Sequence, residues 1–194
     1  MGVRFRKNKK QAENMNIENF KLVEFYNQPS ELIERYIVAL QYIKPAETKR
    51  QVFNMKLKHV ELVKETLASG NDRDLIKVVA KVQKITKEEV LEMPIIEFFS
   101  IVNSIREQLK TIIKAEENAL TPSKIDFNFE AVEGSERMAK FGIYNTLEAL
   151  SGGDALKYKK YMNMEFAEIF TVLYMRKTSS DIREEMQEIE KIKD

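Results

Sequence analysis

Apolar residues recur at intervals of three and four positions along most of this chain, which is the spacing of one face of an α-helix. The pattern predicts a protein that is mainly α, a compact multi-helix bundle. Helices are expected over residues 16–28, 30–44, 46–70, 73–84, 86–93, 94–120, 135–150, 154–177 and 178–194. The stretch 94–120 is expected to be the longest of them.

Helix breakers and capping residues mark several of the predicted ends. Pro45 ends the second helix, because the residue before a proline is pushed out of helical geometry. Gly70 suits the left-handed position just past a helix. Thr86 and Glu89 have the spacing of a capping box, in which each side chain accepts a hydrogen bond from the other residue's backbone N–H.

Residues 125–131 depart from the helical spacing. Ile125, Phe127 and Phe129 alternate with polar residues, which is the period of a β-strand. A lone strand leaves its backbone groups unpaired, so it needs a second strand from this chain or from another chain. An irregular extended connector is the alternative, and it is the interpretation that we favour from the sequence. The prediction is therefore at most a minor β element near 125–131.

The stretch "SGGDALKYKKYMNMEF" (151–166) holds the only double glycine and raises the alternative of a phosphate-binding loop. Such a loop needs Gly-Lys-Ser/Thr after its first glycine, and here Asp154 stands where a phosphate would lie. A corner between two helices accounts for the same residues, because one glycine ends a helix and Asp154 caps the next. We therefore expect a corner.

Composition and charge exclude several classes of protein. The 194 residues are 43% apolar and 32% charged, as in globular chains. No apolar run approaches the roughly 18 residues of a membrane span, and the absence of cysteine excludes disulfides and thiol chemistry. The net charge is +1, but basic residues gather without acids in the first ten positions: Arg4, Arg6, Lys7, Lys9 and Lys10. This arm is either a frayed, solvated terminus, which is the interpretation that we favour, or a contact for nucleic-acid phosphate or for an acidic partner surface.

Candidate catalytic and metal-binding residues are sparse. His59 is the only histidine, and a single histidine cannot build a histidine-rich metal site. Carboxylate pairs such as Glu88 and Glu89 lie in helical stretches that also contain lysines. No nucleophile, base and orienting group occur at a recognisable spacing. The sequence therefore predicts a protein that is not an enzyme, with no catalytic residue, no cofactor and no metal.

Residues suited to protein–protein contact are more frequent. Met162 and Met164 are flexible apolar side chains that adapt to irregular surfaces. Ordinary packing in the core is the alternative for these methionines, and it is the interpretation that we favour from the sequence. Ile182, Met186 and Ile189 form a narrow stripe, as in a helix that packs on another helix or another subunit. Together with Ile125, Phe127 and Phe129, they are the candidate interaction residues.

Two segments echo each other. "EEVLEMPIIEFFSIV" (88–102) and "KYKKYMNMEFAEIFTVL" (157–173) each combine a short helix, a kink that contains methionine and an aromatic-rich helix. The echo indicates either an old duplication or two similar corners.

A longer pattern runs through "KIDFNFEAVEGSERMAKFGIYNTLEALSGGDALKYKKYMNMEFAEIFTVLYMRK" (124–177) and "ITKEEVLEMPIIEFFSIVNSI" (85–105). An acidic and aromatic segment leads into a helix, a short turn and the final helix "FAEIFTVLYMRK". Residues 86–177 thereby resemble small structural and assembly proteins of tailed bacteriophages, in particular tail-assembly-chaperone-like proteins. The basic arm and the helical region before residue 86 depart from that pattern.

The resemblance implies a non-enzymatic interaction protein, a virion or tail assembly factor or structural component. Other phage structural or tail proteins are the expected partners, with a homo-oligomer as a further expectation, in the host cytoplasm or the virion and without a membrane. The alternative is a helical nucleic-acid-binding protein that uses the basic arm. The expected organisation is an arm at 1–15, a helical domain at 16–177 with a sub-boundary at 119–134, and a charged helix at 178–194.

Overall fold

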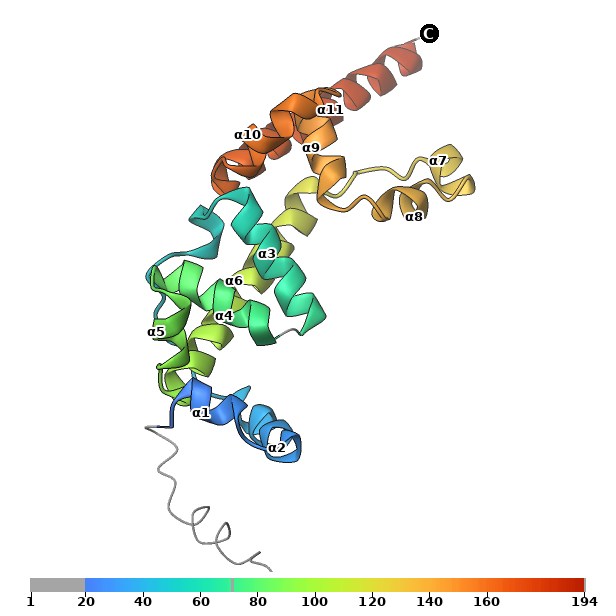
Figure 1. Ribbon diagram of the computed structural model, residues 1–194. Helices are drawn as coiled ribbons and strands as arrows, with labels where there is room; N and C mark the ends of the chain where they lie inside the picture. The colour runs from blue at the N-terminus through green and yellow to red at the C-terminus, as the bar shows by residue number, and fades with distance from the viewer. Residues whose placement is uncertain (1–19, 71, 194) are drawn as a thin grey trace, which may run out of the picture. The chain divides into compact units, whose positions relative to one another are not determined.

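The computed structural model describes residues 20–70 and 72–193, which are mostly helical (Figure 1). The elements are α1 (Leu22–Tyr26), α2 (Ser30–Leu40), the 3₁₀-helix η3 (Val52–Asn54), α3 (Leu57–Ser69), α4 (Asp72–Gln83), α5 (Lys87–Leu91), α6 (Ile95–Leu120), α7 (Phe127–Ala131), α8 (Gly134–Ala139), α9 (Ile143–Ser151), the 3₁₀-helix η4 (Ala155–Lys157), α10 (Tyr158–Met162) and α11 (Phe166–Lys193). Within the described ranges there are isolated β-bridges but no strand. The prediction of a mainly α protein is confirmed.

The described residues divide into two compact units. Unit 1 contains residues 20–50 and 69–107, apart from residue 71, and unit 2 contains residues 51–68 and 108–193. Helix α6 supplies residues to both units. The boundary expected at residue 15 lies outside the described residues, and the boundaries expected at 119–134 and at residue 177 remain predictions.

The core of unit 1 is built from α1, α4, α5 and the first part of α6. The Phe25 ring of α1 meets the Phe99 ring of α6 edge-on, with 6.2 Å between centroids. The buried Asn103 amide donates hydrogen bonds to the carbonyls of Leu40 (3.2 Å) and Ile43 (2.8 Å), which satisfies backbone groups at the end of α2. The main buried apolar residues are Leu22, Phe25, Leu40, Leu75, Val78, Val79, Val82, Val90, Ile95, Phe98, Phe99, Val102 and Ile105.

The core of unit 2 joins η3, α3, α9 and α11 to the second part of α6. The Val52 backbone N–H donates to the Gln108 side-chain carbonyl (2.8 Å), which attaches η3 to α6. The Phe53 ring lies edge-on to the Phe166 ring of α11, with centroids 5.5 Å apart. The main buried apolar residues are Val52, Met55, Leu57, Val60, Val63, Leu109, Ile112, Leu147, Leu150, Phe166 and Ile169.

In unit 1, the corner between α5 and α6 is fixed by the residues that lead into α1. The Leu22 N–H donates to the Met93 carbonyl (2.9 Å), and the Ile95 N–H donates to the Phe20 carbonyl (2.7 Å). These two bonds close an isolated antiparallel bridge. The corner therefore does not depend on side-chain packing alone.

Unit 2 repeats this arrangement at the corner between α10 and α11. The Leu57 N–H donates to the Met164 carbonyl (2.9 Å), and the Phe166 N–H donates to the Met55 carbonyl (2.8 Å). These bonds also close an isolated antiparallel bridge. The two segments that echo each other in the sequence thus form two corners with the same backbone hydrogen bonds.

The turns that precede the two corners also correspond. In unit 1, Lys84 has a left-handed φ of 54° and Thr86 then caps α5 through the expected capping box. In unit 2, Gly152 has a left-handed φ of 64° and Asp154 then accepts from the Leu156 N–H to cap η4. Both the capping box at Thr86 and the helix corner at the double glycine are confirmed.

The strand or extended connector expected at 125–131 is wrong. The Asp126 carboxylate accepts hydrogen bonds from the N–H groups of Asn128 and Phe129, both at 3.0 Å, and caps the five-residue helix α7 (Phe127–Ala131). An N-cap that satisfies two otherwise unpaired donors favours a helical turn. The alternation of apolar and polar residues over so few positions fits this turn as well as it fits a strand.

Several predicted helices are shorter than expected. The helix expected over 30–44 ends at Leu40, before Pro45 can end it, and the Asn103 side chain donates to the Leu40 and Ile43 carbonyls there. The predicted helix 46–70 begins only at Leu57, because the backbone of Val52 and Met55 bonds to other elements instead of continuing a helix. The predicted helix 135–150 is divided into α8 and α9 at Gly142, whose φ of 48° is unsuited to a helix interior.

At the C-terminus, the structure contains a helix that is longer than either of the two predicted there. The predicted helices 154–177 and 178–194 are instead a short α10 followed by α11, which continues without a break from Phe166 to Lys193. At 28 residues α11 is longer than α6, which has 26, so the expectation about the longest helix is also wrong.

Candidate interaction site

A segment of unit 2 leaves nearly all of its side chains uncovered. Every residue from 121 to 142 is exposed except Gly134. The segment nevertheless carries six large apolar residues, which we call the α7–α8 surface: Ile125, Phe127, Phe129, Val132, Met138 and Phe141. Phe127 is 80% exposed and Ile125 is 67% exposed. Phe127 and Phe129 lie in α7, Met138 lies in α8, and the other three residues lie directly before, between or after these helices. Figure 1 shows α7 and α8 projecting away from α9 and α11 of the same unit.

Local contacts give the α7–α8 surface its form. The Phe129 ring lies against Gly134, where an added Cβ would stand 2.5 Å from the ring, so glycine allows this close approach between α7 and α8. The Asn145 side-chain amide in α9 donates to the carbonyl of Met138 (2.8 Å) in the last turn of α8. The Lys140 ammonium lies 5.1 Å from the Phe141 ring centroid, within the range of a cation–π contact.

The start of this segment is attached to α11 by polar contacts. The Ser123 hydroxyl donates to the Asp181 carboxylate (3.1 Å), and Lys124 forms an ion pair with Glu188. The hydrogen bond with Glu188 raises the pKa of Lys124, and the same bond lowers the pKa of Glu188. Exposed ion pairs contribute little to stability, so the segment is positioned without being buried.

A second apolar surface lies on α11. Ile182, Met186 and Ile189, at the expected helical spacing, are 51%, 56% and 54% exposed. Met175 is exposed and lies one heptad before Ile182, and we call these four residues the α11 stripe. The sequence placed three of them on one face, and the structure shows that this face is uncovered within the described residues.

Met162 and Met164 lie elsewhere and are only half-buried. They belong to the corner between α10 and α11, where the Met164 carbonyl accepts the hydrogen bond from Leu57. The structure thus separates the predicted interaction residues into the α7–α8 surface, the α11 stripe and this corner.

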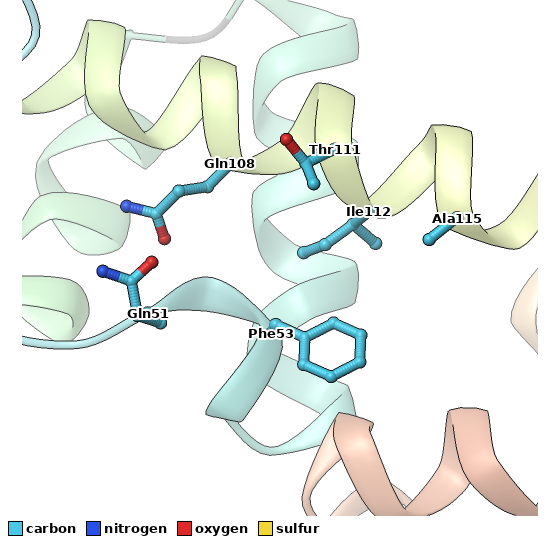
Figure 2. A pocket seen from close by; sticks show the side chains of 6 residues that line it. All are labelled: Gln51, Phe53, Gln108, Thr111, Ile112 and Ala115. Carbon is cyan, nitrogen blue, oxygen red and sulfur yellow. The ribbon is translucent and has the colours of Figure 1, made fainter.

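Unit 2 also contains a small hollow of about 230 Å³ between η3 and α6 (Figure 2). Its lining residues are Gln51, Phe53, Gln108, Thr111, Ile112 and Ala115. Figure 2 shows the amides of Gln51 and Gln108 facing one another at the left, with Ile112 above the Phe53 ring and Ala115 farther to the right. The hollow is mostly apolar and has no ionisable group in its lining, so it is suited to hold an apolar side chain.

Charge in the interior of unit 2 is concentrated at Lys64. Its ammonium pairs with Glu61 (3.1 Å) and Glu116 (2.8 Å) and lies 5.5 Å from the Phe166 ring centroid. Burial pushes the pKa of Lys64 down, but the hydrogen bond to Glu116 and the two carboxylate charges outweigh burial and raise it. Burial raises the pKa of Glu61. This cluster is an ion-pair network that joins α3 to α6.

The other chemical candidates have ordinary structural settings. Asp154 receives a hydrogen bond from Lys157 and the N–H of Leu156, and both lower the pKa of its carboxyl. His59 is half-buried in the first turn of α3, where its backbone N–H donates to the Lys56 carbonyl. Among the residues that the structure describes, no group of three or more His, Asp or Glu side chains is placed to hold a metal ion.

The basic arm with Arg4, Arg6, Lys7, Lys9 and Lys10 lies outside the described residues. None of the helices in the described ranges has both the length and the apolar character that a membrane span requires. Comparison with protein-family models, with curated proteins and with solved structures finds no match to this chain.

Sequence reasoning missed part of the exposed apolar surface. Met138 and Phe141 fall within the single helix expected over 135–150, but the structure breaks that helix at Gly142 and leaves both side chains exposed. The glycine in "KFGIY" was the available signal, since a glycine inside a helical pattern often marks an end. Val132 is not part of a helical or strand-like spacing of apolar residues, so the sequence pattern gave no reason to select it.

Proposed function

We propose that this protein is a non-enzymatic interaction protein that binds an apolar segment of a partner protein through the α7–α8 surface. The observation that carries the proposal is the segment 121–142, in which Gly134 is the single buried residue although six large apolar side chains are present. Ordering this segment costs backbone and side-chain conformational entropy. Almost none of its side chains is buried within the chain, so little burial energy offsets that cost.

Six large exposed apolar side chains within 22 residues are a concentration of apolar surface, and exposed apolar surface of this kind marks binding sites for proteins. The α7–α8 surface combines phenylalanine with flexible methionine, which are residue types enriched at protein interfaces. The small hollow beside Phe53 adds a place for one apolar side chain, but the main binding area lies on α7 and α8.

A role in the assembly of a tailed bacteriophage is the specific form of this proposal. Its support is the sequence resemblance over residues 86–177. Chaperones and connectors of that kind hold apolar parts of other proteins, and an uncovered apolar segment suits that task. The expected partners are therefore structural or tail proteins encoded beside this chain.

The proposal is tested by mixing the protein with each protein encoded by a neighbouring gene and measuring the solution mass by light scattering. A stable complex is expected with one of them. Phe127→Ser should weaken this complex by about tenfold or more, because burial of a phenylalanine contributes about 1.5–3 kcal/mol.

Tyr42→Ser is the matched control, because Tyr42 is an aromatic residue of unit 1 that is 84% exposed. This variant should bind as the parent does. Circular dichroism should show both variants folded, since neither side chain is buried. Equal binding by Phe127→Ser and the parent, or the absence of any complex with the neighbouring proteins, would contradict the proposal.

A further inference from the structure

We infer that the α11 stripe is a self-association surface, on which α11 of a second copy of this chain packs in the antiparallel direction. This surface is distinct from the α7–α8 surface, so the inference goes beyond the proposed function. The two ideas fail independently, because one concerns binding of a different protein and the other concerns the mass of this protein alone.

The α11 stripe has the geometry of a helix-pairing seam. Met175, Ile182, Met186 and Ile189 are separated by seven, four and three residues. At about 100° per residue they fall within roughly 60° of one another around the helix axis. Spacings of seven, four and three are those of the core positions of a coiled coil.

Unit 2 uses another face of the same helix for its own core. Phe166 and Ile169 are 2% and 1% exposed, whereas Ile182 is 51% exposed. At about 100° per residue, Phe166 and Ile169 lie roughly 140–160° around the helix from Ile182. The stripe therefore points away from the core to which α11 is attached.

The contacts with residues 123 and 124 also leave the stripe open. They are made by Asp181 and Glu188, which lie to one side of the stripe at roughly 100–120° from Ile182. From Ile182 to Ile192, every residue of α11 is exposed. Figure 1 shows this C-terminal end of α11 extending past α9 and α10.

The charges beside the stripe select the direction of the second helix. Arg183 and Glu190 flank one side of the stripe, and Glu185 flanks the other. Residues at such flanking positions pair across a two-helix interface and set its orientation.

In an antiparallel pair, Met186 of each copy lies opposite Ile189 of the other. In this orientation, the flank that carries Arg183 and Glu190 in one copy lies against the same flank of the other copy. Arg183 of each copy therefore faces Glu190 of the other, which gives two attractive pairs. In a parallel pair, opposite sides meet and Glu185 of each copy faces Glu190 of the other, which gives two repulsive pairs. Charge complementarity thus favours the antiparallel pair.

Cysteine cross-linking tests the direction, and the chain has no cysteine of its own to interfere. A mixture of the Met186→Cys and Ile189→Cys proteins should form a disulfide-linked dimer faster than either protein alone, because these positions are opposed only between unlike variants. A parallel pair would cross-link each single variant with itself, and that result would overturn the inference.

Charge reversal tests the same interface through affinity. Glu190→Arg places two arginine pairs across an antiparallel interface and should weaken the dimer by about tenfold, but it would strengthen a parallel one. Adding Arg183→Glu to Glu190→Arg should restore the affinity. Both side chains are exposed, so the fold should be unchanged by circular dichroism.

The mass of the parent protein decides whether the surface associates at all. Sedimentation equilibrium should show a concentration-dependent dimer that Ile189→Ser abolishes. A protein that stays monomeric up to about 1 mM would overturn the inference, as would a dimer that is unaffected by Ile189→Ser and Glu190→Arg.

Discussion

Lys64 shows at the scale of single residues how unit 2 accommodates charge in its interior. Its side chain and those of Glu61 and Glu116 are 27%, 16% and 26% exposed. Breaking a largely buried pair costs more than the pair itself contributes, because the remaining charges lose their partner. Removal of the lysine would leave two carboxylates close together.

Lys64→Met should lower the free energy of unfolding at neutral pH by about 1–2 kcal/mol. Burial holds the pKa of Glu61 above its ordinary value, so protonation of Glu61 favours the folded state. The stability lost in this variant should therefore shrink as the pH falls through that raised pKa. Urea unfolding at neutral pH and at mildly acidic pH measures both effects.

Lys77→Met provides the comparison, because Lys77 forms a more exposed pair with Asp74 in unit 1, where its side chain is 47% exposed. A loss of less than about 0.5 kcal/mol is expected there. Equal losses for the two variants would show that burial of the Lys64 cluster does not matter.

At the scale of elements, short helices of this protein are set by their caps. The five-residue helix α5 lies between Thr86, which accepts the Glu89 N–H at 3.1 Å, and the corner at Met93. The Thr86 N–H donates in return to the Glu89 carboxylate (2.7 Å), which lowers the pKa of Glu89. Helices this short are not stable through propensity alone.

Thr86→Ala should lower the free energy of unfolding by about 1 kcal/mol, because an N-cap acceptor is lost, and Thr86→Ser should retain most of it. Thermal unfolding of the three proteins at neutral pH measures the difference. If alanine and serine were equally tolerated, the capping box would have no role in stability.

The same reasoning explains why α7 was not predicted. Asp126 followed by an apolar residue is a helix-start signal, but the alternation of Ile125, Phe127 and Phe129 is a strand signal over the same positions. A stretch of five to seven residues is too short to distinguish helical spacing from the alternation of a strand. The two hydrogen bonds at Asp126 decide for the helix.

At the scale of the whole molecule, the described chain contains two units that share a local architecture. Each unit has a left-handed residue, a capped short helix and a bridged corner before its long helix. The sequences FKL at 20–22 and MKL at 55–57 provide the bridging backbone in the two cases. The echo of the corner segments was visible in the sequence, but these short partners were not.

A chain that ends at Asp181 tests the independence of the last turns of α11. Residues 182–192 are exposed and bury no apolar side chain within the described structure. At a protein concentration at which the parent is monomeric, their removal should leave the free energy of unfolding nearly unchanged, since within one copy little more than the exposed Lys124–Glu188 pair is lost. A fall of several kcal/mol in urea unfolding would show that these turns support the fold.

Local sequence patterns were sufficient to predict the helical class, the capping box at Thr86, the helix corner at the double glycine and the face that Ile182, Met186 and Ile189 share. These features depend on residues within a turn or two of one another, so their helical spacing and capping signals can be recognised within a short stretch of sequence. Tertiary structure alone decided that the helix after Pro45 starts only at Leu57, that the two corners are bridged, and that the α7–α8 surface is uncovered. Those outcomes depend on hydrogen bonds and burial between residues distant in the chain, which no local pattern encodes.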